Sequence, residues 1–162
     1  MATKSVDTFA HTNPAFCALV LRAFVEGYQK SDARGVLLPL MLLPLPVILS
    51  NDLASTFDGT NSRTGLITWT GRNPELILSL PYYVDGSAQL SREALLFAVT
   101  YKVLKLNDNG RIETVETGLR RKLRTPASDS KGKAFLHSRT FGKWLGDTGS
   151  LETIFACLGI KS

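Results

Sequence analysis

The residues that could do chemistry are few and widely spaced in this sequence. The two cysteines, Cys17 and Cys157, lie in apolar surroundings near opposite ends of the chain, and the histidines, His11 and His137, are distant from each other. A zinc site needs four such ligands at short local spacings, and the sequence has no CxxC or HxxxH pair. The cysteines therefore fit small apolar core residues, which excludes a disulfide framework and favours a reducing compartment.

The motifs of nucleophilic and phosphate chemistry are also missing. The sequence has no GxSxG turn to expose a serine and no GxxxxGK[ST] or GxGxxG loop to surround a phosphate. His137 and Ser138 are sequence neighbours, but a triad also needs an orienting carboxylate, so a surface or loosely packed histidine is the simpler interpretation. The acidic residues are too scattered for a metal-dependent nuclease. We expect no enzyme, no catalytic residue, no cofactor and no metal site.

The charge distribution points instead to a partner. The chain has 162 residues and a net charge of +5. Residues 101–143 contain eleven Lys or Arg and four Asp or Glu, a net charge of +7, whereas the other 119 residues carry a net −2. Such asymmetry suggests contact with a polyanion, although a solvated basic face gives the same pattern. The candidate nucleic-acid-binding residues are Arg111, Arg120, Arg121, Lys122, Arg124, Lys131 and Lys133. No pattern for reading bases accompanies them, so the expected DNA contact is independent of sequence.

The elements that position these residues are predicted to be mostly helical. A composition of 44% hydrophobic and 20% charged residues is typical of a packed globular protein, and the length favours one domain. Asn13 and Pro14 predict the start of a first helix. Its buried face would carry Phe16, Leu19, Val20, Phe24 and Tyr28, with Arg22, Glu26 and Gln29 lying off that face.

The next stretch, residues 36–49, has no charge and contains three prolines. A membrane span needs about 20 apolar residues, so we expect a central buried element that Pro44 and Pro46 kink or break. An apolar surface left uncovered here would need a partner. Residues 1–13 lack the apolar region of a signal peptide, and the protein is expected in the cytoplasm.

The middle of the chain gives mixed signals. Residues 64–70 are ambiguous between strand and helix. Asn73 and Pro74 predict a short helix over residues 74–80, followed by a loop over 81–89. A second helix is expected to open at Ser91, with a core stripe of Leu95, Leu96, Val99, Val103 and Leu104. The two tryptophans, Trp69 and Trp144, are interpreted as core more readily than as interface residues.

The clearest strand signal is a hairpin over residues 103–106 and 111–115, joined by the Asn-Asp-Asn-Gly turn at 107–110. A helix over residues 134–145 follows, and Ser150 and Gly159 predict the two ends of a last helix. The expected fold class is α+β, mostly α-helical: a winged-helix-like single domain with a small β-hairpin wing. It comprises a helical core over 13–106, a hairpin wing over about 103–115, a basic segment over 116–133 and C-terminal helices over 134–160.

Several phrases of the sequence, taken in order, resemble one protein family. They are NPAF at 13–16, FVEGY at 24–28, the Leu/Pro-rich residues 37–49, Trp69 with NPEL at 73–76, SREALLF at 91–97 and TIFACLGI at 153–160. Together they resemble the middle component of three-component ABC systems, bacterial anti-phage and anti-plasmid operons of the Lamassu kind. The resemblance implies a small non-catalytic adaptor that bridges an SMC/Rad50-like ATPase and an effector, often a nuclease. It thins over residues 107–133, where the DNA contact is expected.

The sequence leaves a second function open. A free-standing winged-helix DNA-binding regulator would also combine helices with a basic wing, but it should bind DNA alone and usually as a dimer. An adaptor should need its ATPase for stability or for DNA engagement. An enzyme is the third alternative, and only a pocket with perturbed titratable groups would support it.

Overall fold

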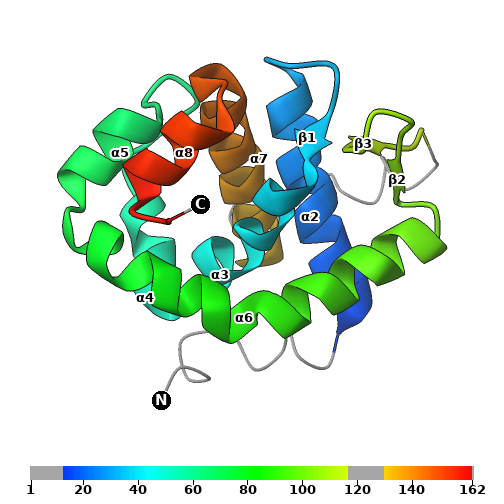
Figure 1. Cartoon of the computed structure of the whole chain (residues 1–162). Coiled ribbons are helices and arrows are strands. Elements are labelled where there is room, and N and C mark those ends of the chain that lie inside the picture. The colour runs from blue at the N-terminus through cyan, green and yellow to red at the C-terminus, as the bar shows by residue number, and fades with distance from the viewer. Residues whose placement is uncertain (1–12, 117–129, 162) are drawn as a thin grey trace.

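The computed structural model describes residues 13–116 and 130–161. It is mostly helical, with a small three-stranded antiparallel sheet at one end (Figure 1), which confirms the α+β prediction. The helices are α2 (Pro14–Gln29), α3 (Pro44–Ile48), α4 (Asn51–Ala54), α5 (Leu66–Arg72), α6 (Glu75–Thr100), α7 (Ser130–Thr148) and α8 (Leu151–Leu158). Two 3-10 helices, η2 (Leu38–Leu42) and η3 (Ser55–Phe57), and the strands β1 (Val36–Leu37), β2 (Leu104–Leu106) and β3 (Arg111–Thr114) complete it.

The centre of the fold is the contact between α2 and α7, which pack backbone to backbone. Helix α2 starts as predicted: the Asn13 side chain accepts a hydrogen bond from Phe16 N at 3.0 Å. Three small residues of α7, spaced by four, face three carbonyls of α2 with the same spacing. The pairs are Ser138 with Val20, Gly142 with Phe24, and Gly146 with Tyr28. A Cβ on Gly142 would lie 2.0 Å from the Phe24 carbonyl oxygen, so only glycine allows this approach.

An aromatic cluster fills the core beside this contact. Trp69 and Trp144 are fully buried and pack on Phe57 with ring centroids 5.3 and 5.5 Å away, which confirms their core placement. Each indole N–H also has an acceptor: Trp69 Nε1 donates to Thr56 Oγ1 at 3.1 Å and Trp144 Nε1 to Asn61 O at 3.0 Å. Burying both rings therefore leaves neither donor unsatisfied.

The uncharged residues 36–49 form three short elements instead of one helix. They run through β1, η2 and α3, and Pro39 and Pro44 lie in the first turns of η2 and α3. Leu40, Leu45 and Val47 are completely buried, so the central location is confirmed. The helical path breaks at Leu43, between η2 and α3, because the following Pro44 lacks a backbone donor and clashes with the preceding turn.

Helix α6 corrects the prediction for residues 73–104. It runs unbroken through 26 residues, with Pro81 inside it, so the predicted loop over 81–89 and the separate start at Ser91 are wrong. Asn73 does not cap α6; its amide donates to Trp69 O at 2.9 Å, at the end of α5. Pro81 lacks the N–H that would bond the Ile77 carbonyl, and this carbonyl lies against Gly159, the left-handed cap of α8.

The buried face of α6 also differs from the predicted stripe. Ala94 and Ala98 are fully buried, whereas Leu96 is 69% exposed and Val99 36% exposed. The helix packs on α2 and on residues 38–48. The ambiguous residues 64–70 form most of the short helix α5, and the predicted helix over 134–145 lies inside the longer α7.

The predicted hairpin is confirmed, and it gains a third strand. The sheet order is β1-β3-β2, all antiparallel, with Val36 opposite Ile112 and Lys105 opposite Glu113. The turn is closed by Asn107, whose side-chain oxygen accepts from the backbone N–H groups of Asn109 and Arg111, both at 3.0 Å. The short strand β1 ties the hairpin to the helical core.

Candidate partner and nucleic-acid interface

A buried arginine anchors the base of the hairpin. Arg22 Nη1 donates to Val103 O at 3.0 Å and to Val115 O at 2.7 Å, the carbonyls just outside β2 and β3. Arg22 is 1% exposed, so the expectation that it lies off the buried face of α2 is wrong. Glu26 Oε1 is 3.9 Å from Arg22 Nε and partly balances the charge. The hairpin is thereby fixed to α2, most of whose residues are buried.

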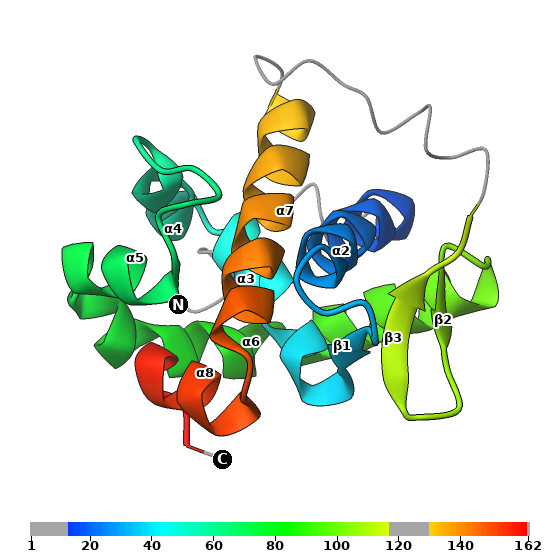
Figure 2. The same cartoon turned by 90° about the horizontal axis from the view of Figure 1, so that it is seen from above.

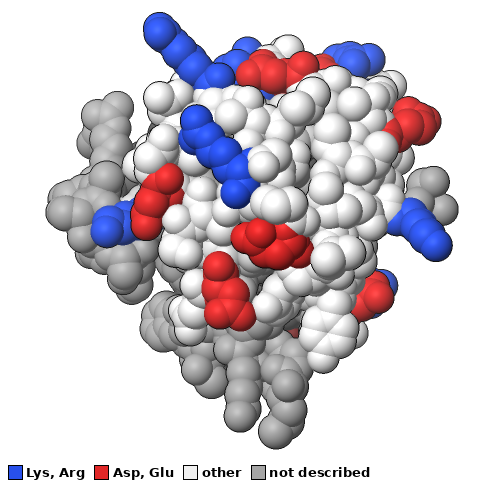
Figure 3. All heavy atoms as spheres, turned by 90° about the vertical axis from the view of Figure 1, so that its left-hand side faces the viewer, with Lys and Arg blue, Asp and Glu red and all other residues white. Residues whose placement is uncertain are grey.

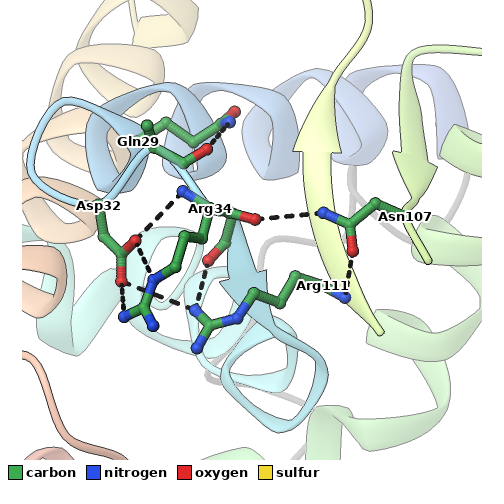
Figure 4. A network of polar contacts seen from close by, with 7 residues as sticks. Gln29, Asp32, Arg34, Asn107 and Arg111 are labelled. Carbon is green, nitrogen blue, oxygen red and sulfur yellow. Dashed lines mark hydrogen bonds and ion pairs between the residues drawn. The ribbon is translucent and has the colours of Figure 1, made fainter. Parts of the chain in front are cut away.

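A second polar network fixes the tip of the hairpin to the turn after α2 (Figure 4). Arg111 Nη1 donates to Gly35 O at 3.0 Å and lies 3.6 Å from Asp32 Oδ2. Asp32 also accepts from Arg34 Nε at 2.9 Å and Nη2 at 2.8 Å, while Asn107 donates to Arg34 O at 3.1 Å. The hydrogen bond from Arg34 is the main reason why the pKa of Asp32 is lowered. The charged carboxylate therefore persists at neutral pH and holds both arginines.

These contacts occupy the cations of the hairpin. Arg111, a predicted nucleic-acid-binding residue, has a side chain only 15% exposed, and its guanidinium faces Asp32. Lys105 Nζ pairs with Glu113 Oε1 across the hairpin at 2.9 Å. The pKa of Glu113 is lowered by hydrogen bonds from Asn107 and then from Lys105. Both basic side chains of β2 and β3 therefore already have acidic partners within the chain.

The other predicted basic residues are placed only in part. Lys131 and Lys133 lie in the first turn of α7, and Lys133 is exposed. Helix α2 separates α7 from the hairpin, so the fold does not bring Lys133 and Arg111 together (Figure 2). The remaining candidates lie outside the described residues. They are Arg120, Arg121, Lys122 and Arg124. Their DNA contact stays a prediction.

The outer face of α6 carries exposed apolar side chains at both ends. Leu78 and Leu96 are 86% and 69% exposed. They are 18 residues apart, which is five helical turns, so they point to the same side about 27 Å from each other. We define the α5-side patch as Ile67, Leu78 and Tyr82, and the hairpin-side patch as Leu96, Val99 and Tyr101, all exposed.

The two patches are separated by a polar stretch of α6. Asp85, Gln89, Arg92 and Glu93 are exposed between them. The surface at the α5 end is mostly uncharged, with acidic and basic side chains scattered over it (Figure 3). Exposed apolar and tyrosine side chains are candidates for a protein-binding surface.

Comparison with known proteins assigns the chain to a family. Residues 6–162 match the family model described as "ABC-three component (ABC-3C) system Middle Component 3". The chain belongs to this family. No curated protein and no solved structure matches this Middle Component 3 chain. The finding confirms the resemblance to a middle component of a three-component ABC system.

Within this Middle Component 3 chain, sequence reasoning missed the exposed face of α6. Leu96 was expected in the core and Tyr82 in a loop. The signal that identifies the face is the spacing of positions 78, 82, 85, 89, 92, 96 and 99, which follows one side of a helix once Pro81 is accepted inside it.

The described part of the Middle Component 3 chain contains neither a cluster of metal ligands nor a helix that could span a membrane. Among residues 13–116 and 130–161, no three His, Cys, Asp or Glu side chains are grouped so as to hold a metal ion. Over the same residues, no helix has both the length and the apolar character needed to cross a membrane.

Proposed function

We propose that this chain is a non-catalytic adaptor that bridges an SMC/Rad50-like ABC ATPase and an effector in a cytoplasmic, Lamassu-like anti-phage or anti-plasmid complex. The observation that carries the proposal is the pair of exposed apolar patches, which include Leu78 and Leu96 at the two ends of one face of α6. A stable interface buries about 800 Å² on each partner around an apolar centre. Each patch offers such a centre, and membership of a three-component family supplies two other components.

The arrangement of the patches favours two different partners over one. The α5-side patch and the hairpin-side patch lie about 27 Å apart along α6, with acidic and basic side chains between them. A continuous helix keeps this spacing fixed, because Pro81 does not break it. An adaptor needs this property, since the relative position of its two partners is then set by one rigid element.

The alternative, a free-standing winged-helix DNA-binding regulator, has one observation in its favour and one against. The sheet order β1-β3-β2, with a hairpin at its outer edge, is compatible with a winged helix. The helix before the hairpin would then be expected to read DNA. That helix is α6, which carries three acidic residues and one basic residue, a net charge of −2. DNA phosphates would repel this charge, so the adaptor is the better proposal.

The experiment compares three single-residue variants of α6 that introduce the same side chain on the same face. Leu78→Glu changes the α5-side patch, Leu96→Glu the hairpin-side patch, and Gln89→Glu the polar stretch between them. All three positions are exposed, so the variants should fold. The full chain is co-expressed with the proposed ATPase and effector, and the complexes are separated by size-exclusion chromatography.

The adaptor proposal predicts that Leu78→Glu and Leu96→Glu each lose a different partner, while Gln89→Glu retains both. Retention of both partners by all three variants would contradict the proposed surfaces. A chain that ignores both partners and binds duplex DNA alone as a dimer would support the regulator instead.

A further inference from the structure

A basic pocket lies beside α7. Its volume is about 430 Å³, and it is formed by α7, the end of α2 and residues 57–62. This volume falls in the range of sites for small ligands. Lys30, Arg139 and Lys143 line it, and its lining residues, all within the described chain, include no Asp or Glu.

Several donors in this pocket have no acceptor among the residues that the structure describes. Lys143 is held by Asp147, with both carboxylate oxygens 2.7 Å from its Nζ. Among the described residues, by contrast, the side chains of Lys30 and Arg139 form neither ion pairs nor hydrogen bonds. The hydroxyls of Ser62 and Thr140 likewise have no hydrogen-bond partner in that part of the chain. Two cations and two hydroxyls around one cavity form a site for an anion rich in acceptors.

The walls of the pocket indicate which anion fits. Phe57, Leu136 and His137 give it an apolar side, and the Phe57 and His137 rings are stacked with centroids 5.0 Å apart and planes inclined by 13°. Burial is the main cause that lowers the pKa of His137, so the ring is neutral at pH 7 and adds to the apolar wall. A lining that combines these donors with apolar groups matches a phosphate joined to a sugar and base.

We propose that this pocket binds the phosphate of a nucleotide unit, either in a free nucleotide or in a nucleic-acid backbone. Arg139 presents its guanidinium fork to the phosphate oxygens, Lys30 adds a second positive charge, and Ser62 and Thr140 donate hydroxyl hydrogen bonds. Leu136 and His137 contact the sugar or base, and the buried Phe57 ring supports His137 by stacking on it. This site lies apart from the patches on α6, so it does not depend on the adaptor proposal.

The test measures binding of three probes to the full chain by isothermal titration calorimetry. The probes are inorganic phosphate, ATP and a short single-stranded oligothymidine. Arg139→Gln and Lys30→Gln each remove one cation of the pocket, and the matched control Arg72→Gln removes an exposed cation of α5 that does not line it. Thermal melting of each variant checks that the fold is intact.

The proposal predicts that each pocket variant weakens binding of ATP or of the oligothymidine about tenfold or more, because a hydrogen bond to a charged group is lost. Arg72→Gln should leave the affinity unchanged. An effect on ATP alone identifies a free nucleotide as the ligand, and an effect on the oligothymidine identifies the backbone. Absence of binding by all three probes, or an equal loss in Arg72→Gln, would overturn the proposal.

Discussion

The contact between α2 and α7 makes Gly142→Ala a direct test of the fold. A Cβ at this position would lie 2.0 Å from Phe24 O, 2.9 Å from Phe24 C and 3.0 Å from Tyr28 N. All three are backbone atoms of α2, so no side chain can rotate away. The two helices would have to separate, and that separation would loosen the aromatic cluster beside them.

The size and sign of the effect follow from two opposing contributions. In a helix, replacing glycine by alanine stabilises by up to about 1 kcal/mol when the position is open. Overpacking a tight contact costs about 1–3 kcal/mol or more, and the backbone overlap here places Gly142→Ala at the upper end. Gly71→Ala in α5 is the matched control, because a Cβ there meets nothing within 4 Å.

The assay is thermal and urea unfolding followed by circular dichroism. For a chain of this length, 1 kcal/mol corresponds to about 2–4 °C in Tm. Gly142→Ala should therefore lower Tm by roughly 4–12 °C, given its expected cost of about 2–3 kcal/mol, whereas Gly71→Ala should leave Tm unchanged or raise it slightly. If Gly142→Ala is as stable as the unmodified chain, the close approach of α2 and α7 is refuted.

Three further predictions address the hairpin, the pocket wall and the basic segment. Arg22→Met should cost about 3 kcal/mol in urea unfolding, because the carbonyls of Val103 and Val115, one buried and one partly buried, lose their donor, and unchanged stability would contradict the anchoring role. Since burial lowers the pKa of His137, the unfolded chain binds that proton more readily, so stability should fall as pH drops through about 6.5. His137→Gln should reduce this dependence in melts at pH about 7.5 and 5.5; an identical dependence would refute the assignment. Changing Arg120, Arg121 and Lys122 together to Ala should weaken DNA binding by the assembled complex and reduce its log–log salt slope, by about 0.9 per lost phosphate contact. Loss of a protein partner with unchanged DNA affinity would instead identify a docking segment.

Local signals in the sequence predicted the ends of elements well. The Asn13 cap of α2 is present, Ser150 accepts from Thr153 N at 3.1 Å at the start of α8, and Gly159 ends α8 with a φ of 72°. The Asn-Gly turn of the hairpin was equally predictable, because Gly110 has a φ of 75°. Each of these caps and turns depends on residues within four positions of one another, so the local sequence is enough to predict it.

Features that depend on distant residues were not predictable. Arg22 has the spacing of a surface residue, and its acceptors are 81 and 93 residues further along the chain. The strand β1 has only two residues, which are extended because β3 pairs with them. Pro81 suggested a break, yet packing holds α6 continuous.

The candidate site also combines features that nearby residues determine with features that depend on distant residues. The sequence located Arg111 at the hairpin correctly, but its pairing with Asp32 arises from a turn nearly eighty residues earlier in the chain. The exposed face of α6 could not be recognised from the sequence, because a loop was expected over residues 81–89, in the middle of this helix. The family resemblance, by contrast, came from the order of short phrases and was confirmed without knowledge of the fold.

The most direct test of the bridging role is reconstitution of the complex with and without this chain. Purified ATPase and effector are mixed alone and with the full chain, and the assemblies are identified by native mass spectrometry. The bridging proposal predicts that ATPase and effector associate only when the chain is present, in a complex that contains all three. Direct association of ATPase with effector in its absence, unchanged when it is added, would contradict the proposed bridging role.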